Sequence, residues 1–190
     1  DGEAWAALTE TLDWQSAAGD QTLAVERRTV GLWRPKDAAA TVVLWETRLE
    51  PGPGRDAVKL GGSHYFGLGM RWVESMDRGG RFFNPDGAEG DLVRGQERLV
   101  RTRWCAYTAQ AEGKPVTAAM LDHPKNPRHP AHFFTMPAPF AYLSATLNYW
   151  KEPLEVKRGE PLVLRYAVAA WDGEAKAEEV EKLYQAWTKR

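Results

Sequence analysis

The chain has 190 residues, of which 43% are hydrophobic and 27% are charged, and this is enough for one folded domain with a real core. Its formal net charge is −1 with both signs scattered along the chain, whereas binding to nucleic acid or to an anionic membrane would require a basic surface. No run approaches about 18 uninterrupted apolar residues, so the sequence predicts no membrane-spanning helix.

Tryptophan is the unusual residue of the composition, because nine of the 190 residues are Trp. We expect most of these rings to lie in the core of a β-rich fold. A few could form an aromatic floor for a flat apolar ligand face, such as that of a sugar ring. The single cysteine, Cys105, excludes an intrachain disulfide, and we expect it to be a small buried side chain rather than a reactive thiol.

The first half of the chain predicts β-strands. Residues 22–33 and 41–50 are rich in β-branched and aromatic residues, and the stretch between them predicts a loop. The sequence EPGPGRD, residues 50–56, then breaks the chain. Residues 63–73 predict a further strand, in which alternation places five side chains on one face: His64, Phe66, Leu68, Met70 and Trp72. Two glycines on its other face leave room for a bulge or for the close approach of another group.

The second half predicts further strands and one helix. Residues 99–109 and 116–122 are typical of a hairpin around AEGK. Residues 140–150 are aromatic and ambiguous, and residues 154–173 predict two strands joined at Arg158 and Gly159. Residues 175–188 predict a C-terminal helix, because four apolar residues fall on one stripe: Val180, Leu183, Tyr184 and Trp187.

These elements together predict the fold class. Eight or nine expected strands and one terminal helix favour a mainly β protein, an antiparallel β-sandwich followed by a C-terminal α-helix. The chain contains no internal repeat and no low-complexity segment that would mark a second unit. We therefore expect residues 1–190 to form a single domain.

The sequence LDHPKNPRHPAHFF, residues 121–134, holds three of the four histidines and three prolines, and we call it the proline-rich segment. His123, Asn126 and His129 each precede a proline, which disfavours the α region for all three. The prolines recur every third residue, the period of a polyproline II helix. We therefore expect a stiff extended ribbon that places His123, Asn126, His129 and His132 along one edge.

Three uses of this ribbon stay open. Neighbours on one edge would lie roughly 9 Å apart, so three histidines reach one metal ion only if the segment folds back on itself. Imidazole, amide and guanidinium groups at fixed spacing would suit recognition of a hydroxyl-rich ligand. The third use is a rigid surface connector whose histidines cap turns. We expect no cofactor, and the alternative is a metal ion on His123, His129 and His132.

Three stretches also carry a resemblance to a known family: GGSHYFGLGMRW, RWCAYTAQAEGKPVTAAMLDHPKNPRHPAHFF and VKRGEPLVLRYAVAAWDG. In order and spacing over residues 20–175 they resemble the bacterial family catalogued as methane oxygenase PmoA. The resemblance implies a soluble β-sandwich, often periplasmic or secreted, similar to carbohydrate-handling supersandwiches such as mutarotases, although this chain shows no signal peptide. It also implies a further N-terminal region that this chain lacks, so some site groups would be either missing or supplied by a second copy in a homo-oligomer.

The candidate catalytic residues are histidines and arginines. Ring opening, epimerisation or elimination of a sugar needs an acid and a base on opposite sides of the ring, and histidine serves either role near neutral pH. His64, on its glycine-flanked strand, and His123 form the expected pair. Arg71 and Arg128 would hold a carboxylate or an enolate-like oxygen through their forked donors. Asp122 could orient His123, although neighbouring residues on a strand point to opposite faces.

A second set of residues is expected to bind the substrate: Asn126, His129, His132, Trp104, Tyr107 and Asn148. For Trp104 and Tyr107 the alternative is packing in the core. Two main functions stay open, an enzyme that performs acid–base chemistry on a sugar or sugar derivative in an aromatic-lined cleft, and a non-catalytic carbohydrate-binding module. A histidine-based copper or zinc protein is the third. The expected partner of the first two is a small molecule or a glycan.

Overall fold

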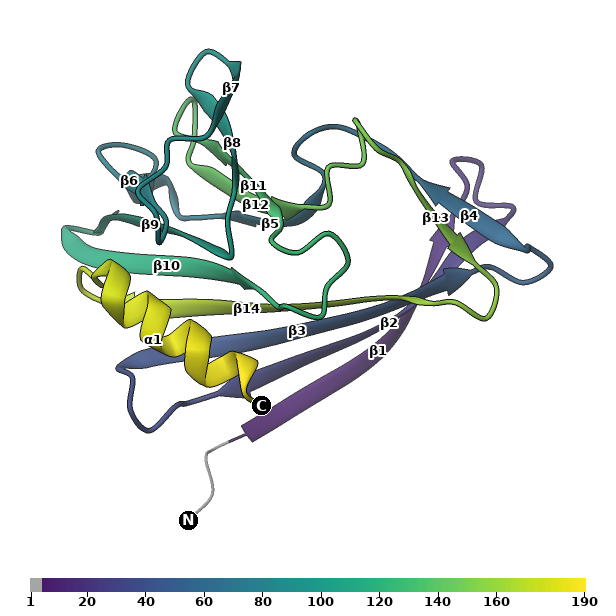
Figure 1. Ribbon diagram of the computed structural model, residues 1–190, viewed down its shortest axis with the longest axis horizontal. Helices are drawn as coiled ribbons and strands as arrows, with labels where there is room; N and C mark the ends of the chain where they lie inside the picture. Colours follow the sequence, from purple (N-terminus) through teal and green to yellow (C-terminus); the bar gives the residue numbers. More distant parts are fainter. Residues whose placement is uncertain (1–4) are drawn as a thin grey trace.

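The structure, a computed structural model that describes residues 5–190, is an antiparallel β-sandwich with a C-terminal helix (Figure 1). The long sheet has seven strands in the order β1-β2-β3-β14-β10-β9-β6. In that order they are Trp5–Gln15, Thr22–Trp33, Ala40–Pro51, Leu162–Asp172, Lys114–Asp122, Trp104–Ala111 and Arg81–Phe83. The short sheet has five strands in the order β5-β12-β11-β8-β7, which are Gly67–Arg71, Tyr142–Thr146, His132–Met136, Glu97–Arg101 and Asp91–Arg94.

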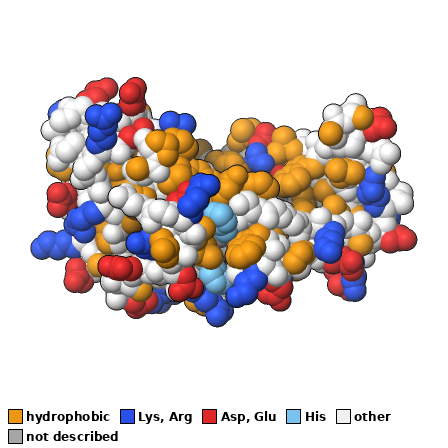
Figure 2. Space-filling model, turned by 90° about the horizontal axis from the view of Figure 1, so that it is seen from above, with side chains coloured by type: hydrophobic (Ala, Val, Ile, Leu, Met, Phe, Trp, Pro, Cys, Tyr) orange, Lys and Arg blue, Asp and Glu red, His pale blue; other side chains and the backbone are white. Residues whose placement is uncertain are grey.

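Three smaller elements complete the fold. Strands β4 (Ala57–Leu60) and β13 (Leu154–Lys157) pair as a two-stranded sheet, and a short 3-10 helix, η1, spans Glu74–Met76. The two-stranded sheet rises from one end of the long strands and the short sheet from the other (Figure 1). Seen from above, the face between these ends is hollowed and rich in hydrophobic side chains (Figure 2).

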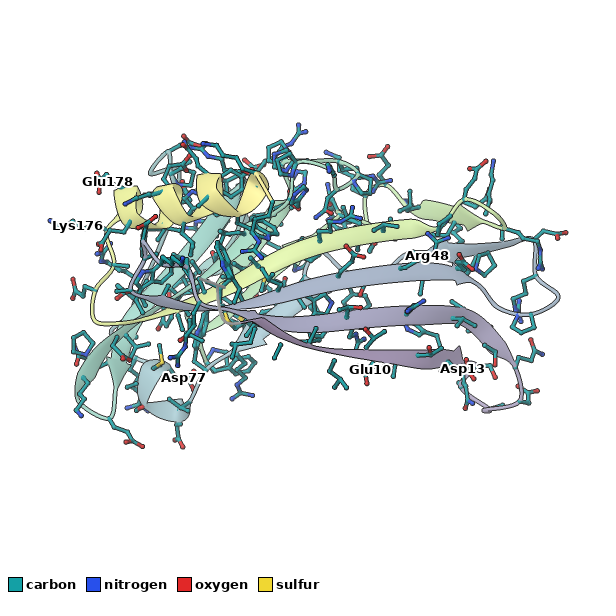
Figure 3. All side chains as sticks on the ribbon, turned by 90° about the horizontal axis from the view of Figure 1, so that it is seen from below. Glu10, Asp13, Arg48, Asp77, Lys176 and Glu178 are labelled. Atoms are coloured by element: carbon teal, nitrogen blue, oxygen red, sulfur yellow. The ribbon has the colours of Figure 1, made fainter. Side chains whose placement is uncertain are left out.

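Helix α1 (Ala177–Thr188) covers the face of the long sheet that points away from the short sheet. The predicted apolar stripe is its buried side, and it packs against the rings of Trp33, Trp104 and Trp171. The helix begins near Lys176 and Glu178, at one end of the molecule, and runs toward the middle (Figure 3). Helix α1 has 12 residues, and no helix within residues 5–190 is long and apolar enough to cross a membrane.

The second core lies between the two sheets. Cys105 and Met120 of the long sheet pack there against Phe133 and Leu143 of the short sheet. Burial raises the pKa of the Cys105 thiol to about 12. Cys105 is therefore the small buried side chain that we expect from the sequence, and not a reactive thiol. Away from this core, charged residues such as Glu10, Asp13 and Arg48 project from the long strands (Figure 3).

The C-terminal helix, the β9–β10 hairpin and the two strands expected over residues 154–173 are confirmed, but two other expected strands differ. Residues 99–101 belong to β8 in the short sheet, and β9 begins only at Trp104. The turn at Arg158 and Gly159 joins β13 to β14 as expected, and the pairing partners are β4 for β13 and β3 and β10 for β14. The strand expected over residues 63–73 starts at Gly67, so Leu68 and Met70 face the core while His64 lies in the preceding turn.

Gly67 provides a test of the join between β5 and β12. A Cβ atom at Gly67 would lie 1.9 Å from the Ala145 carbonyl oxygen, and this is backbone that cannot move without breaking the pairing. We expect Gly67→Ala to lower the free energy of unfolding by about 3 kcal/mol, measured by urea denaturation. The matched control is Gly61→Ala, where nothing lies within 4 Å of the added atom. Equal stability of the two variants would contradict this packing.

Candidate functional site

Asp122, the last residue of β10, is fully buried and organises the proline-rich segment. Its Oδ1 accepts a hydrogen bond from Asn126 Nδ2 at 2.7 Å. Its Oδ2 accepts from the Ala131 N–H at 2.8 Å and from His129 Nδ1 at 2.7 Å. Burial raises the pKa of Asp122, and the three donors oppose this rise. One carboxyl group thus joins the end of β10 to the middle and the end of the loop that follows it.

The proline-rich segment is not the extended ribbon that its proline spacing predicts. The His123 carbonyl accepts from the Asn126 N–H at 2.9 Å and the Asn126 carbonyl accepts from the His129 N–H at 3.3 Å, so the backbone makes two successive turns. Arg128 has a φ of +63° in this reversal. Asp122 therefore contacts His129 and does not orient His123, which corrects the role expected for it.

Asn126 binds the protein's own backbone rather than a substrate. Strand β10 ends at Asp122, opposite Tyr166, and just beyond it the His123 N–H donates to the Arg165 carbonyl of β14 at 3.3 Å. The Asn126 side chain completes this pairing: its Nδ2 donates to the same carbonyl and its Oδ1 accepts from the Arg165 N–H, each at 2.7 Å. Asn126 is 4% exposed, and its amide group is used in the bonds with Arg165 and Asp122.

Arg128 is likewise a structural residue. Its guanidinium donates to the carbonyls of Leu147, Glu152 and Pro153, and this fixes the loop between β12 and β13. These bonds occupy most of the guanidinium N–H donors, so few donors remain for the substrate carboxylate expected there. Asn148 lies in the same loop with a φ of +58°, and its Oδ1 is buried without a hydrogen-bond partner in the described part of the chain.

His123 lines a pocket of about 330 Å³ beyond the C-terminal end of α1, and Trp45 and Tyr166 also contribute to its lining. Its Nδ1 accepts from the Lys125 N–H at 3.0 Å, which places the proton of the neutral ring on Nε2. Its ring meets Trp187 edge-on, with 5.0 Å between centroids. Burial lowers the pKa of His123, and the positive charges of Arg165 and Lys125 lower it further.

His64 lies in the turn before β5 and packs on the short sheet, beside Phe134 of β11 and Glu97 of β8. Its ring is 5.1 Å from that of Phe134 and 6.3 Å from that of Trp150, and its Nε2 is 3.9 Å from Glu97 Oε2. The pocket that His123 lines does not include His64, so the expected pair of catalytic histidines is not brought together.

The remaining predicted surface residues are dispersed. Arg71 is exposed at the end of β5, with its guanidinium carbon 3.8 Å from the centre of the Phe140 ring. His132 is half-buried at the start of β11, between Arg101 of β8 and Thr146 of β12. Neither Arg71 nor His132 lines the cavity between the long sheet and the edge of the short sheet.

Trp104 and Tyr107 are core residues, which corrects their assignment to substrate binding. Trp104 is fully buried beneath α1, and its Nε1 donates to Glu181 Oε2 at 2.7 Å. Tyr107 is 1% exposed, stacks between Trp72 and Phe82, and donates its hydroxyl proton to the Met76 carbonyl. Neither ring has surface left for a ligand, so the core packing named as their alternative is what the structure has.

The best-formed cavity lies between the long sheet and the edge of the short sheet, and has a volume of about 240 Å³. We call it the intersheet cavity. Its walls are mostly apolar, and five aromatic side chains contribute to them: Trp14, Trp45, Phe66, Tyr149 and Tyr166. Leucines of the long sheet and of β4 supply much of the remaining lining. No histidine lies among the described residues that line it.

Glu26 supplies the charge at one end of the intersheet cavity. It is 2% exposed and accepts four hydrogen bonds, two from Arg28, one from Thr47 and one from Trp14 Nε1. Burial alone would raise the pKa of Glu26, but these donors outweigh it and the pKa is lowered. The carboxylate is thus satisfied by the protein itself, and this end of the cavity offers a ligand no free acceptor on Glu26.

Tyr149 and Tyr166 form the polar part of the rest of the lining. They are 9% and 3% exposed, and neither hydroxyl makes a hydrogen bond within residues 5–190. Burial raises the pKa of Tyr149 to about 12 and that of Tyr166 well above its ordinary value, so both are neutral donors at neutral pH. Both hydroxyls are therefore available to bond to a ligand or to water in the cavity.

Sequence reasoning missed three residues that matter here: Glu26, Tyr166 and Glu97. Glu26 had a usable signal, because it shares the buried face of β2 with Ala24. Tyr166 falls on the apolar face of β14 and looks like any core residue. Nothing local marks Glu97. The described residues contain no group of three or more His, Cys, Asp or Glu side chains that could hold a metal ion.

The pH dependence of stability tests whether the fold holds His132 in its neutral form. Burial, followed by the nearby charges of Arg101 and Lys151, lowers its pKa in the folded chain. Between the ordinary histidine value of about 6.5 and the lowered value, the unfolded chain binds the proton and the folded chain does not, so stability is lost as pH falls through this window.

We therefore expect the free energy of unfolding to drop between pH 7.5 and pH 5.5 by more in the wild type than in His132→Gln, as measured by urea denaturation at each pH. Subtracting the two pH dependences removes the contributions of Asp122, Glu26 and the other groups that both proteins share. An identical pH dependence would show that His132 is not held in its neutral form by the fold.

Comparisons with known proteins assign the chain to a family. The model of a family of unknown function, DUF6807, matches residues 1–185. No PmoA-like family is shown, so the resemblance inferred from the motifs is corrected by this match. No curated protein matches the chain. Because the match covers nearly the whole sequence, the chain belongs to the DUF6807 family.

Proposed function

We propose that this protein binds carbohydrate and holds one sugar ring in the intersheet cavity. The observation that carries the proposal is Tyr166, which is 3% exposed and lines the cavity, and whose hydroxyl has no hydrogen-bond partner within residues 5–190. A hydrogen bond between this hydroxyl and a bound ligand would contribute about 0.5–1.5 kcal/mol.

The size and walls of the cavity suit a single ring. Pockets that enclose drug-sized ligands have about 300–1,000 Å³, so a volume of about 240 Å³ favours a smaller ligand. Trp14, Trp45 and Phe66 present aromatic surface, and a sugar ring has apolar C–H faces that pack on such surface. A purely apolar ligand would fit the walls but would leave the tyrosine hydroxyls unpaired.

The polar groups favour a neutral ligand rather than a charged one. Glu26 is neutralised by Arg28, and its oxygens are occupied, so neither a cation nor an anion finds a free counter-charge there. Tyr149 and Tyr166 can each donate one hydrogen bond and accept others. Sugar hydroxyls complement such groups, because they also donate and accept.

Binding without turnover is the form of this proposal that the geometry favours. An acid–base mechanism on a sugar needs a titrating group at hydrogen-bond distance from the ring. The described lining contains no histidine, and its two tyrosines have raised pKa values. The expected catalytic residues His64 and His123 lie outside the cavity, so the carbohydrate-binding module is preferred to the sugar enzyme.

Tyr166→Phe tests the proposal. The substitution removes one hydroxyl and keeps the ring, so we expect affinity for the sugar that binds to fall about tenfold while the fold is retained. The measurement is isothermal titration with a panel of neutral monosaccharides, starting from glucose, galactose, mannose and xylose, after a screen by saturation-transfer NMR.

The matched control is Tyr184→Phe, a buried tyrosine of α1 that lies outside the cavity and should leave affinity unchanged. Two results would count against the proposal. The first is that no neutral sugar binds the wild type at millimolar concentration. The second is a sugar that binds equally well to the wild type and to Tyr166→Phe.

A further inference from the structure

Glu97 carries a buried polar atom that makes no hydrogen bond within residues 5–190. The Glu97 side chain, at the start of β8, is 8% exposed, and its Oε1 accepts a hydrogen bond from Arg94 Nη2 at 2.7 Å. Its Oε2 is buried and has no hydrogen-bond partner among residues 5–190. An unpaired carboxylate oxygen is costlier than an unpaired neutral group, so its position calls for a partner from outside the chain.

His64 defines where that partner would sit. His64 Nε2 lies 3.9 Å from Glu97 Oε2, which is too far for a direct hydrogen bond. A single oxygen with two bonds of about 2.8 Å would bridge this gap at an angle of about 90°. A hydroxyl does this well, because its proton goes to the carboxylate while its oxygen accepts from the imidazole N–H.

A metal ion is a poorer occupant of the same gap. Protein zinc sites use at least three protein ligands, but His64 and Glu97 are only two, and residues 5–190 contain no group of three such ligands. Water could bridge the pair in the absence of ligand, and a ligand hydroxyl would displace it.

The surroundings of the pair are aromatic and partly open to solvent. The ring of Tyr65 is 5.5 Å from that of His64, and the ring of Trp150 is 6.3 Å from it. Tyr65 is 42% exposed and Trp150 is 53% exposed. A polar anchor beside exposed aromatic faces is the combination that a hydroxylated ring with apolar C–H faces can use.

This place adjoins the intersheet cavity through one short turn. Residues 61–67 contribute Gly61, Phe66 and Gly67 to the cavity lining and also carry His64 and Tyr65. The rings of Tyr65 and Phe66 are 5.1 Å apart, and Phe66 is 46% exposed. Aromatic side chains are therefore continuous from the cavity to the His64–Glu97 pair.

We infer that His64 and Glu97 form a second subsite, which binds a hydroxyl of a further sugar ring and makes the ligand an oligosaccharide. The inference rests on the proposed function, since the first ring occupies the intersheet cavity. It specifies that the ligand has more than one sugar ring, and it names His64 and Glu97 as the residues that contact the further ring.

The test compares ligands of two lengths in Glu97→Gln. The probes are glucose and galactose alongside cellotriose, maltotriose and galactotriose, measured by isothermal titration. We expect a trisaccharide to bind the wild type at least about tenfold more tightly than its monosaccharide, and Glu97→Gln to remove this gain while leaving monosaccharide affinity within about twofold. The glutamine keeps an oxygen for Arg94 but loses an acceptor for the bridging hydroxyl.

Two further variants make the result specific. His64→Phe keeps a ring against Phe134 but removes the nitrogen, and it should also lose the trisaccharide gain even if Glu97→Gln proves unstable. Glu160→Gln, an exposed glutamate in the turn between β13 and β14, should change nothing.

The outcomes separate the two proposals. If a monosaccharide binds but trisaccharides bind no better, or bind equally well to Glu97→Gln and His64→Phe, the subsite is overturned and the cavity stands. If trisaccharide affinity depends on Glu97 and not on Tyr166, the cavity is overturned and the subsite stands. If none of the sugars binds the wild type, both are overturned.

Discussion

The buried carboxyl group of Asp122 is the constraint on which the rest of the structure around the cavity depends. It lies at the end of β10 in the long sheet and accepts the N–H of Ala131, the residue before β11 in the short sheet. Its hydrogen bonds with Asn126 and His129 fold the intervening loop into two turns. A charge buried this deeply is costly unless every acceptor is used, and three donors converge on this one.

This network fixes parts of the molecule that the cavity needs. Asn126 holds the free edge of β14 at Arg165, one residue before Tyr166. Arg128, in the same loop, holds three carbonyls of the loop that carries Tyr149. The two tyrosines that line the cavity therefore come from segments that the proline-rich segment positions. Its role is to shape the site, and its side chains do not themselves line the intersheet cavity.

Buried polar groups of this protein fall into two kinds, and the difference guides the functional proposals. Asp122, Asn126 and Glu26 have all of their main partners inside the chain, which is the pattern of groups that stabilise a fold. The Tyr166 hydroxyl and the buried Glu97 Oε2 have no hydrogen-bond partner within residues 5–190. Groups of the second kind cost stability unless something binds to them, so they are better indicators of a ligand than histidine content or exposed charge.

The sequence predicts the local features of the fold well. The stripe of Val180, Leu183, Tyr184 and Trp187 identifies the helix, and the turn around Gly113 identifies the β9–β10 hairpin, because both patterns depend only on neighbouring residues. Pairing between distant strands leaves no such pattern. The partnership of β13 with β4 joins residues about a hundred positions apart, and nothing in either sequence specifies it.

The site was less predictable for the same reason. Histidines and arginines drew attention by residue type, but Arg128 binds backbone carbonyls and His129 binds Asp122. The regular proline spacing suggested an extended ribbon, yet the buried Asp122 carboxyl stabilises a folded loop instead, and a tertiary contact of this kind outweighs a local preference. Trp104 and Tyr107 have the chemistry of ligand-binding residues, and only their burial shows that they belong to the core.

Amide hydrogen exchange in the wild type and in Asp122→Leu tests the central role of this carboxyl group most directly. Leucine has a side chain of similar shape but no oxygen, so the donors of Asn126, His129 and Ala131 all lose their acceptor. We expect a protected Ala131 amide in the wild type, exchanging at least about a hundredfold faster in the variant, while amides of β2 stay unchanged. Equal exchange of the Ala131 amide in the two proteins would contradict it.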